Sequence, residues 1–273
     1  MLEKTFELID KFQPVAIHIP IDKNKMEEVV ETLYSQMFPF DEKLKIGEIH
    51  FKLKKCVMDL IASVAKLTGQ EFAETAIYRF FNSLSKIRDR LYKDAACYLK
   101  NDPAAKSIEE VIIAYPGFFA LAVHRIAHEL CQLEVPLIPR IFAEYAHAKV
   151  GIDIHPAAKI GKNLFMDHGT GIVIGETSVI GDNVKIYQGV TLGALYVEKK
   201  LSNTKRHPTI ENDVVIYSNA TILGGDTVVG HNSTIGGGAW ITHSVIPYSL
   251  VYNSVDVKIK TVKSFVQPND FII

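Results

Sequence analysis

Residues 151–193 decide the fold, and they read GIDIHPAAKIGKNLFMDHGTGIVIGETSVIGDNVKIYQGVTLG. Aliphatic residues recur in this stretch at steps of six, and the following residue is often glycine. The same step resumes later, over residues 210–222 and 229–241. The in-phase positions are Ile154, Ile160, Met166, Ile172, Ile174, Ile180, Ile186, Leu192, Ile210, Ile216, Ile222, Val229, Ile235 and Ile241.

A six-residue period of this kind is typical of a left-handed parallel β-helix. Each unit supplies a short strand and a turn, which form one side of a triangular coil. The aliphatic residue points inward and stacks on its equivalents in neighbouring coils, so the core is continuous. We expect glycine, asparagine and aspartate to occupy turns with positive φ. The segment 194–208 interrupts the period, so we expect it to project as a loop.

The first half of the chain has a different pattern. Only three of the 17 glycines precede residue 151. Apolar residues there follow helical spacing, and Asn101-Asp102-Pro103 predicts the end of the longest helix. The predicted helices cover 24–36, 51–67, 71–99, 107–114, 117–133 and 139–149. The expected fold class is therefore α+β, with a helical domain at 1–150, a β-helix domain at 151–250 and a tail at 251–273.

Composition narrows the function classes. The formal net charge is −1 and the pI is about 6.8, which does not favour a nucleic-acid binder or a polybasic membrane-surface protein. No stretch approaches the roughly 20 apolar residues needed to span a bilayer. The amphipathic start, MLEKTFELIDKF, does not resemble a signal peptide. Cys56, Cys97 and Cys131 fit no disulfide framework, so we expect a reducing, cytoplasmic setting.

Several polar residues occur where the repeat does not need them. His168, in the segment MDHGTG, is a candidate general base, because imidazole titrates near neutrality and accepts a proton from a hydroxyl. Asp153 is a candidate to orient it. A turn histidine that caps backbone groups is the alternative interpretation. We expect Asp153 and Asp167 to lie on neighbouring coils, on different sides, where an edge shared between subunits would bring them together.

Further candidates flank the repeat. Asp102 follows the long helix, and Arg206-His207 ends the 194–208 insert. Adjacent cationic groups suit a substrate carboxylate, although solvated loop cations are the alternative. A zinc site is a separate hypothesis, but ligand-pair spacing of the His-x-His kind is missing from the sequence. The histidines that raise the zinc hypothesis are His155, His231 and His243.

Four blocks of sequence resemble the serine O-acetyltransferase family of hexapeptide-repeat acyltransferases. They are DIHPAAKIG (153–161), MDHGTGIVIGET (166–177), QGVTLG (188–193) and RHPTI (206–210). The resemblance extends from about Asn101 to residue 246. It implies direct transfer of acetyl from acetyl-CoA to the hydroxyl of L-serine, which gives O-acetyl-L-serine and CoA in the first step of cysteine biosynthesis. Acetyl-CoA is then a co-substrate, and no permanently bound cofactor is expected.

The resemblance also implies roles for particular residues. His168 corresponds to the catalytic base and Asp153 to its partner. Asp102 and Asp167 correspond to the residues that hold the serine ammonium, and Arg206 and His207 to those that hold its carboxylate. CoA is expected along a groove between β-helices of a homotrimer, near Gly193, Ala194 and Ser218. Helical domains pair two trimers into a hexamer, and L-cysteine competes at the serine site as a feedback inhibitor.

The sequence departs from the family pattern at several points. Ala194 replaces a common second glycine, and the insert is polar, with Lys199, Lys200 and Lys205. Lys258 and Lys260 either contact CoA phosphates or belong to a solvated tail. The terminal Ile273 suggests docking into O-acetylserine sulfhydrylase, since an extended tail with a free carboxylate suits an amino-acid site.

Two other functions remain open. One is an acetyltransferase of the same fold that acts on a sugar or another hydroxyl acceptor. The other is a non-catalytic β-helix scaffold or a metal-dependent hydratase.

Overall fold

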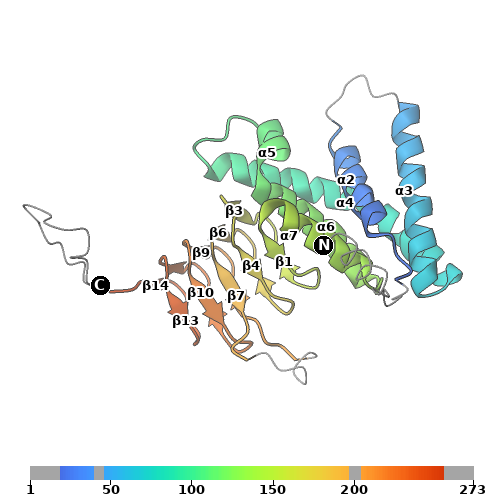
Figure 1. Ribbon diagram of the computed structural model, residues 1–273. Helices are drawn as coiled ribbons and strands as arrows, with labels where there is room; N and C mark the ends of the chain where they lie inside the picture. Colours follow the sequence, from blue (N-terminus) through green and yellow to red (C-terminus); the bar gives the residue numbers. More distant parts are fainter. Residues whose placement is uncertain (1–18, 40–45, 197–203, 255–273) are drawn as a thin grey trace, which may run out of the picture.

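The computed structural model describes residues 19–39, 46–196 and 204–254. Helices come first and a coiled stack of short strands follows (Figure 1). The predicted tail beyond residue 254 and Lys199 and Lys200 lie outside the described residues. The described helices are α2 (Lys23–Met37), α3 (Ile46–Leu67), α4 (Gln70–Asn101), α5 (Ile108–Ala114), α6 (Pro116–Gln132) and α7 (Ile138–Val150).

The helix boundaries follow local signals in the sequence. Helix α4 ends at Asn101, where the backbone N–H of Asp102 donates to Tyr98 O and Pro103 follows. Ser107 caps α5, because its hydroxyl accepts from the backbone N–H of Glu110 at 3.1 Å. Helix α7 ends at Gly151, whose φ of 69° lies in the left-handed region. The helical prediction for the first half is confirmed.

The second half is the predicted left-handed parallel β-helix. Its strands form three parallel sheets, with orders β1-β4-β7-β10-β13, β2-β5-β8-β11 and β3-β6-β9-β12-β14. We call these side 1, side 2 and side 3. The strands are β1 (Asp153–Ile154), β2 (Lys159–Ile160), β3 (Phe165–Asp167), β4 (Val173–Ile174), β5 (Val179–Ile180), β6 (Lys185–Tyr187), β7 (Thr191–Gly193), β8 (Thr209–Ile210), β9 (Val215–Ile216), β10 (Thr221–Leu223), β11 (Val228–Val229), β12 (Thr234–Ile235), β13 (Trp240–Ile241) and β14 (Leu250–Val251).

Every in-phase aliphatic residue is buried, with an exposed fraction between 0% and the 9% of Ile160. The register stacks them directly, as in the pairing of Ile154 with Ile174 and of Ile174 with Leu192. The 194–208 insert leaves the coil after β7 and returns at β8, and its described residues Leu195 and Tyr196 are exposed.

The expected role of the repeat glycines is wrong in one respect. The glycines that follow the aliphatic positions are absent from the positive-φ residues of the described chain. They are small because neighbouring coils approach closely. A Cβ on Gly161 would lie 2.3 Å from Gly181 O, which is impossible without displacement of the backbone. Positive φ falls instead on other turn residues, such as Asn163, Asn183 and His168.

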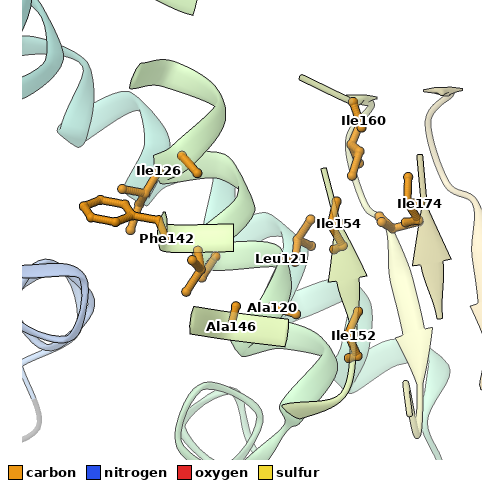
Figure 2. Close-up of a cluster of buried hydrophobic side chains, with 14 of the residues drawn as sticks. Ala120, Leu121, Ile126, Phe142, Ala146, Ile152, Ile154, Ile160 and Ile174 are labelled. Atoms are coloured by element: carbon orange, nitrogen blue, oxygen red, sulfur yellow. The ribbon is translucent and has the colours of Figure 1, made fainter. Parts of the chain in front are cut away.

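The helices cap the first coil of the β-helix with a shared apolar core. Figure 2 shows Leu121 of α6 beside Ile154 of β1, while Ile126 of α6 packs toward Phe142 of α7. Gly117 of α6 approaches β3 so closely that a Cβ would lie 2.5 Å from Met166 O. Burial of this apolar surface fixes the helices on the coil.

A buried ion pair strengthens the same junction. Asp94 of α4 and Arg125 of α6 have almost no exposed surface, and Arg125 Nε donates to Asp94 Oδ2 at 2.6 Å. Arg125 also donates to Gly161 O at 3.0 Å, and Asn163 N donates to Asp94 Oδ1 at 2.9 Å. The pair therefore links two helices to the first coil, with its charges satisfied by hydrogen bonds.

One predicted placement is wrong. Asp153 lies on β1 and Asp167 on β3, which are the first and third sides of the same coil rather than parts of neighbouring coils. The physical reason is that one coil contains about three repeat units, and Val173, which pairs with Asp153, is already on the second coil.

The helices of the described residues range in length from 7 residues, in α5, to 32, in α4. No single helix there is both long and apolar enough to cross a membrane. Helices α5 and α6 meet the length and composition criteria only as a pair, with a bend of 77° between them.

Candidate active site

The first group of candidate residues lies where the turns from side 3 to side 1 meet the helical region. We call it the His168 corner. It comprises Asp102, Tyr115, Asp167 and His168. Asp167 ends β3, and His168 follows it with a φ of 57° and a side chain that is 70% exposed. His168 Nδ1 lies 3.8 Å from Asp167 Oδ1, and Asp102 interacts electrostatically with His168. A residue from the helical region thus joins two from the coil.

The carboxylate of Asp102 is held in place by hydrogen bonds. Tyr115 Oη donates to Asp102 Oδ2 at 2.6 Å, and Ala104 N donates to Oδ1 at 2.8 Å. These bonds, the one from Tyr115 first, hold the pKa of Asp102 below its usual range. The same bond raises the pKa of Tyr115 to about 12. Asp102 is therefore a fixed anion at neutral pH, suited to a cationic group.

The turns that connect side 1 to side 2 hold the second group, the His207 corner. It comprises Gly175, Glu176, Thr177, Arg206 and His207. Arg206 forms an ion pair with Glu176 through Nη2 and Oε2. The backbone N–H groups of Arg206 and His207 both donate to Thr177 Oγ1, at 2.9 and 3.0 Å. Thr177 therefore holds the end of the insert against the coil.

The protonation state of His207 follows from its contacts. Thr177 N donates to His207 Nδ1 at 3.1 Å, so Nδ1 accepts and the ring proton is on Nε2. Burial, followed by the charge of Arg206, lowers the pKa of His207 to about 4. His207 is a neutral donor through Nε2 at physiological pH. A Cβ at position 175 would lie 2.0 Å from His207 Cδ2, so glycine there makes room for the ring.

Asp153 belongs to neither corner. The described structure places its carboxylate with Glu144 and His147 of α7, and one potential ligand atom from each lies within 4.8 Å of the others. Arg140 pairs with Glu144 across this group. No hydrogen bond or ion pair in the described structure joins Asp153 to His168.

The histidines of the zinc hypothesis are not brought together. His155, His231 and His243 are not members of the Glu144, His147 and Asp153 group, which is the three-ligand group that the described residues form. His155 is close to Asp153, Glu176 and Arg206, and burial lowers its pKa. Its Nδ1 accepts from Ala157 N at 3.1 Å, which is a turn-capping contact.

The residues expected near CoA lie at two different corners of the coil. Gly193 ends β7 and Ala194 follows it, at the His207 corner. Ser218 is in the turn between β9 and β10, at the edge that carries the His168 corner. Its carbonyl accepts from Gly238 N at 2.9 Å.

Within one chain the two corners are separated by the width of side 1. The strands of this side are two or three residues long, with a turn at each end, so the two corners lie at opposite ends of the side. The structure therefore brings Asp102, Asp167 and His168 together, and Arg206 with His207, but not the two sets.

Sequence reasoning missed three residues that position these groups. Tyr115 orients Asp102, Thr177 orients His207, and Glu176 pairs with Arg206. Glu176 and Thr177 end the block MDHGTGIVIGET, so their place opposite the insert was accessible from the six-residue period. Tyr115 carries no such signal, because its contact depends on how α5 folds back on α4.

Known proteins with similar sequences include serine acetyltransferases. The chain is 52% identical over 171 residues to "Serine acetyltransferase, plasmid" of Synechococcus elongatus, a match that covers 61% of this chain and 53% of that protein. It therefore spans about half of that relative's length. It is 47% identical over 161 residues to the serine acetyltransferase of Bacillus licheniformis, covering 59% of this chain and 72% of that protein. No family model matches the chain.

Solved structures agree with the sequence comparison. Serine acetyltransferase isoform 3 of Entamoeba histolytica, in complex with cysteine, matches with a TM-score of 0.77 and 33% identity, over 92% of this chain and 87% of that one. The Neisseria gonorrhoeae serine acetyltransferase in complex with serine matches with a TM-score of 0.60 and 26% identity, over 86% and 96%.

The left-handed β-helix places the chain in the class of hexapeptide-repeat proteins, as in the Brucella melitensis structure described as a bacterial transferase hexapeptide repeat. Within that class, the chain belongs to the serine acetyltransferase family.

Proposed function

We propose that this chain transfers the acetyl group of acetyl-CoA to the hydroxyl of L-serine, which gives O-acetyl-L-serine and CoA and begins cysteine biosynthesis. The observation that carries the proposal is the chemistry of the two corners. One presents the fixed carboxylate of Asp102 beside that of Asp167, and the other presents a guanidinium and a neutral imidazole N–H. A zwitterionic amino acid needs both, whereas a sugar needs neither charge.

Serine recognition requires two copies of the chain in this proposal. Asp102 and Asp167 of one copy hold the ammonium, while Arg206 and His207 of a neighbouring copy hold the carboxylate. The places of the two corners at opposite ends of side 1 support this arrangement, in which each copy supplies one set. A homotrimer of β-helices gives each corner a partner, and pairing of helical domains would give a dimer of trimers.

The chemistry is a direct transfer. His168 accepts the proton from the serine hydroxyl as its oxygen attacks the thioester carbonyl. The tetrahedral oxyanion then collapses, the C–S bond breaks, and the proton passes from His168 to the leaving CoA thiolate. Asp153 orients His168 and stabilises the charged imidazole. Since these two residues do not meet within one chain, we assign that contact to Asp153 of a second copy.

Acetyl-CoA occupies the groove between copies. Gly193 and Ala194 of one copy and Ser218 of the next would line it, which fits their places at opposite corners of the coil. L-cysteine differs from L-serine only by sulfur in place of oxygen, so the same charged groups would hold it as a feedback inhibitor. Docking of Ile273 into O-acetylserine sulfhydrylase concerns residues outside the described structure and stays part of the proposal.

The test follows release of the CoA thiol from acetyl-CoA with L-serine, L-homoserine, a sugar or no acceptor. We expect release with L-serine well above the other acceptors. Release with the sugar and none with serine would refute the proposal and favour a sugar acetyltransferase. Absence of release with every acceptor, together with stoichiometric zinc, would favour the scaffold or hydratase alternative.

A further inference from the structure

A second polar pocket lies away from both corners. It has a volume of about 440 Å³ and is bounded by α4, α6 and the start of side 2. Its lining shares no residue with the His168 corner or the His207 corner. The residues that carry the argument are Lys86, Arg90, His124, Glu129 and Lys159. A volume of this size suits a small ligand.

The charges that line this pocket are unbalanced. Lys86 and Arg90 are four residues apart on α4 and share a helix face, and Lys159 of β2 completes the wall. Glu129 is the acidic residue among the lining groups. Arg125 also lines the pocket, but its charge is paired with Asp94. Three cationic side chains against one carboxylate leave an excess of two positive charges.

Two buried donor groups in the pocket have no partner in the described structure. They are Nε of Arg90, which always carries a proton, and Nδ1 of His124, which donates in the tautomer that carries its proton on Nδ1. His124 is 3% exposed, so its ring is almost fully removed from solvent. Buried polar atoms are satisfied in most native structures, and an unsatisfied one calls for an explanation. A bound acceptor is the simplest explanation for two such atoms that line the same cavity.

The guanidinium of Arg90 is held in position by the coil. Its Nη2 donates to Ile160 O at 2.8 Å, beside the bond from Arg125 to Gly161 O at 3.0 Å. Burial and the neighbouring charge of Arg125 lower the pKa of Arg90. Asp182 also acts electrostatically on Arg90, but it is not among the residues that line the pocket. A guanidinium held in this way presents its remaining N–H groups to an anion in the pocket.

We propose that this pocket binds a small dianionic oxyanion of the phosphate or sulfate class. The charge of a dianion matches the excess of two. Its oxygens supply an acceptor for Arg90 Nε and, in the tautomer with the proton on Nδ1, for His124. Inorganic phosphate and the phosphate group of a small phosphomonoester share this chemistry, and the volume admits either. The site is separate from the acetyl-transfer site, so the inference does not depend on the proposed function.

The test is isothermal titration calorimetry of the full-length protein with inorganic phosphate, sulfate and glycerol 3-phosphate, at constant ionic strength. Saturating CoA is present to occupy the acetyl-CoA site. We expect Lys86→Met, Lys159→Met and Arg90→Met each to weaken binding roughly tenfold, because each removes a charged hydrogen-bond donor. The matched control is Arg88→Met, which lies on α4 outside the pocket and should bind as the wild type does.

Glycerol 3-phosphate that binds at least as tightly as inorganic phosphate would identify a phosphomonoester site, and the reverse order would identify a site for the free ion. Absence of phosphate and sulfate binding at millimolar concentration would overturn the proposal, as would binding that the three pocket variants leave unchanged. The lysines are exposed, so their variants keep the test valid if Arg90→Met fails to fold.

Discussion

Thr177 Oγ1 lies 2.9 Å from His207 Nδ1, and the same oxygen accepts the backbone N–H groups of Arg206 and His207. One hydroxyl therefore contacts the ring and holds the end of the insert, while the backbone N–H of the same residue sets the tautomer. We predict that Thr177→Val raises the KM for serine about tenfold and changes the KM for acetyl-CoA little, because one hydrogen bond is lost. Steady-state kinetics will measure both constants. Thr234→Val, on β12, is the control and should match the wild type; equal behaviour of the two variants would contradict the assignment.

Gly175 leaves the space that His207 occupies. We predict that Gly175→Ala lowers kcat/KM for serine on the order of a hundredfold, because the new Cβ would displace the ring. Gly47→Ala is the matched control, since a Cβ there meets nothing within 4 Å. Wild-type kinetics for Gly175→Ala would show that the position of the ring is unimportant.

His168 is the assigned base. Its replacement in His168→Ala should lower kcat by roughly 10²- to 10⁴-fold, the usual contribution of general base catalysis. Binding of acetyl-CoA and the melting temperature should be retained, because the side chain is mostly exposed. His243→Ala provides an exposed histidine on the same β-helix as a control. A near-normal kcat for His168→Ala would remove it as the base.

The pKa of His207 makes stability depend on pH. The folded-state pKa, about 4, is below the ordinary value of 6.5, so the unfolded chain binds the proton more readily between these values. Stability linked to His207 is therefore complete above pH 6.5 and is lost as the pH falls toward 4. Other histidines also have lowered pKa values, so their protonation destabilises both proteins at acidic pH. The melting temperatures of the wild type and His207→Gln must therefore be compared across this pH range. The wild type should lose more stability on acidification than the variant does; parallel curves would contradict the shift.

The Asp94–Arg125 pair should dominate the junction of helices and coil. We predict that Asp94→Asn lowers the free energy of unfolding by about 3–5 kcal/mol, because it leaves the buried guanidinium unpaired. Urea denaturation measures this change. Asp89→Asn removes an exposed carboxylate from the same helix, where the effect should stay within about 0.5 kcal/mol. Similar losses in both variants would show that the buried pair has no special role.

The β-helix was predictable because its signal is local. A six-residue period points each aliphatic side chain toward the interior of the coil, and all of the in-phase positions from Ile154 to Ile241 are buried. The helices of the first half were predictable for the same reason, from apolar spacing and from signals such as Asn101-Asp102-Pro103. The role of the repeat glycines was predicted wrongly. They are needed because the backbone of the next coil leaves no room for a Cβ, as at Gly161, which faces Gly181.

The sequence by itself determined the coil, the identity of the candidate residues and the chemistry that each brings. Only the tertiary structure decided which of them meet. Asp102 reaches Asp167 and His168 because α4 and α6 pack on the first coil through the Asp94–Arg125 pair. Asp153 stays apart from His168 because its carboxylate lies with Glu144 and His147 at the end of α7, whereas His168 lies in the turn after β3. Such contacts depend on side-chain packing between segments distant in the chain, which no period in the sequence encodes.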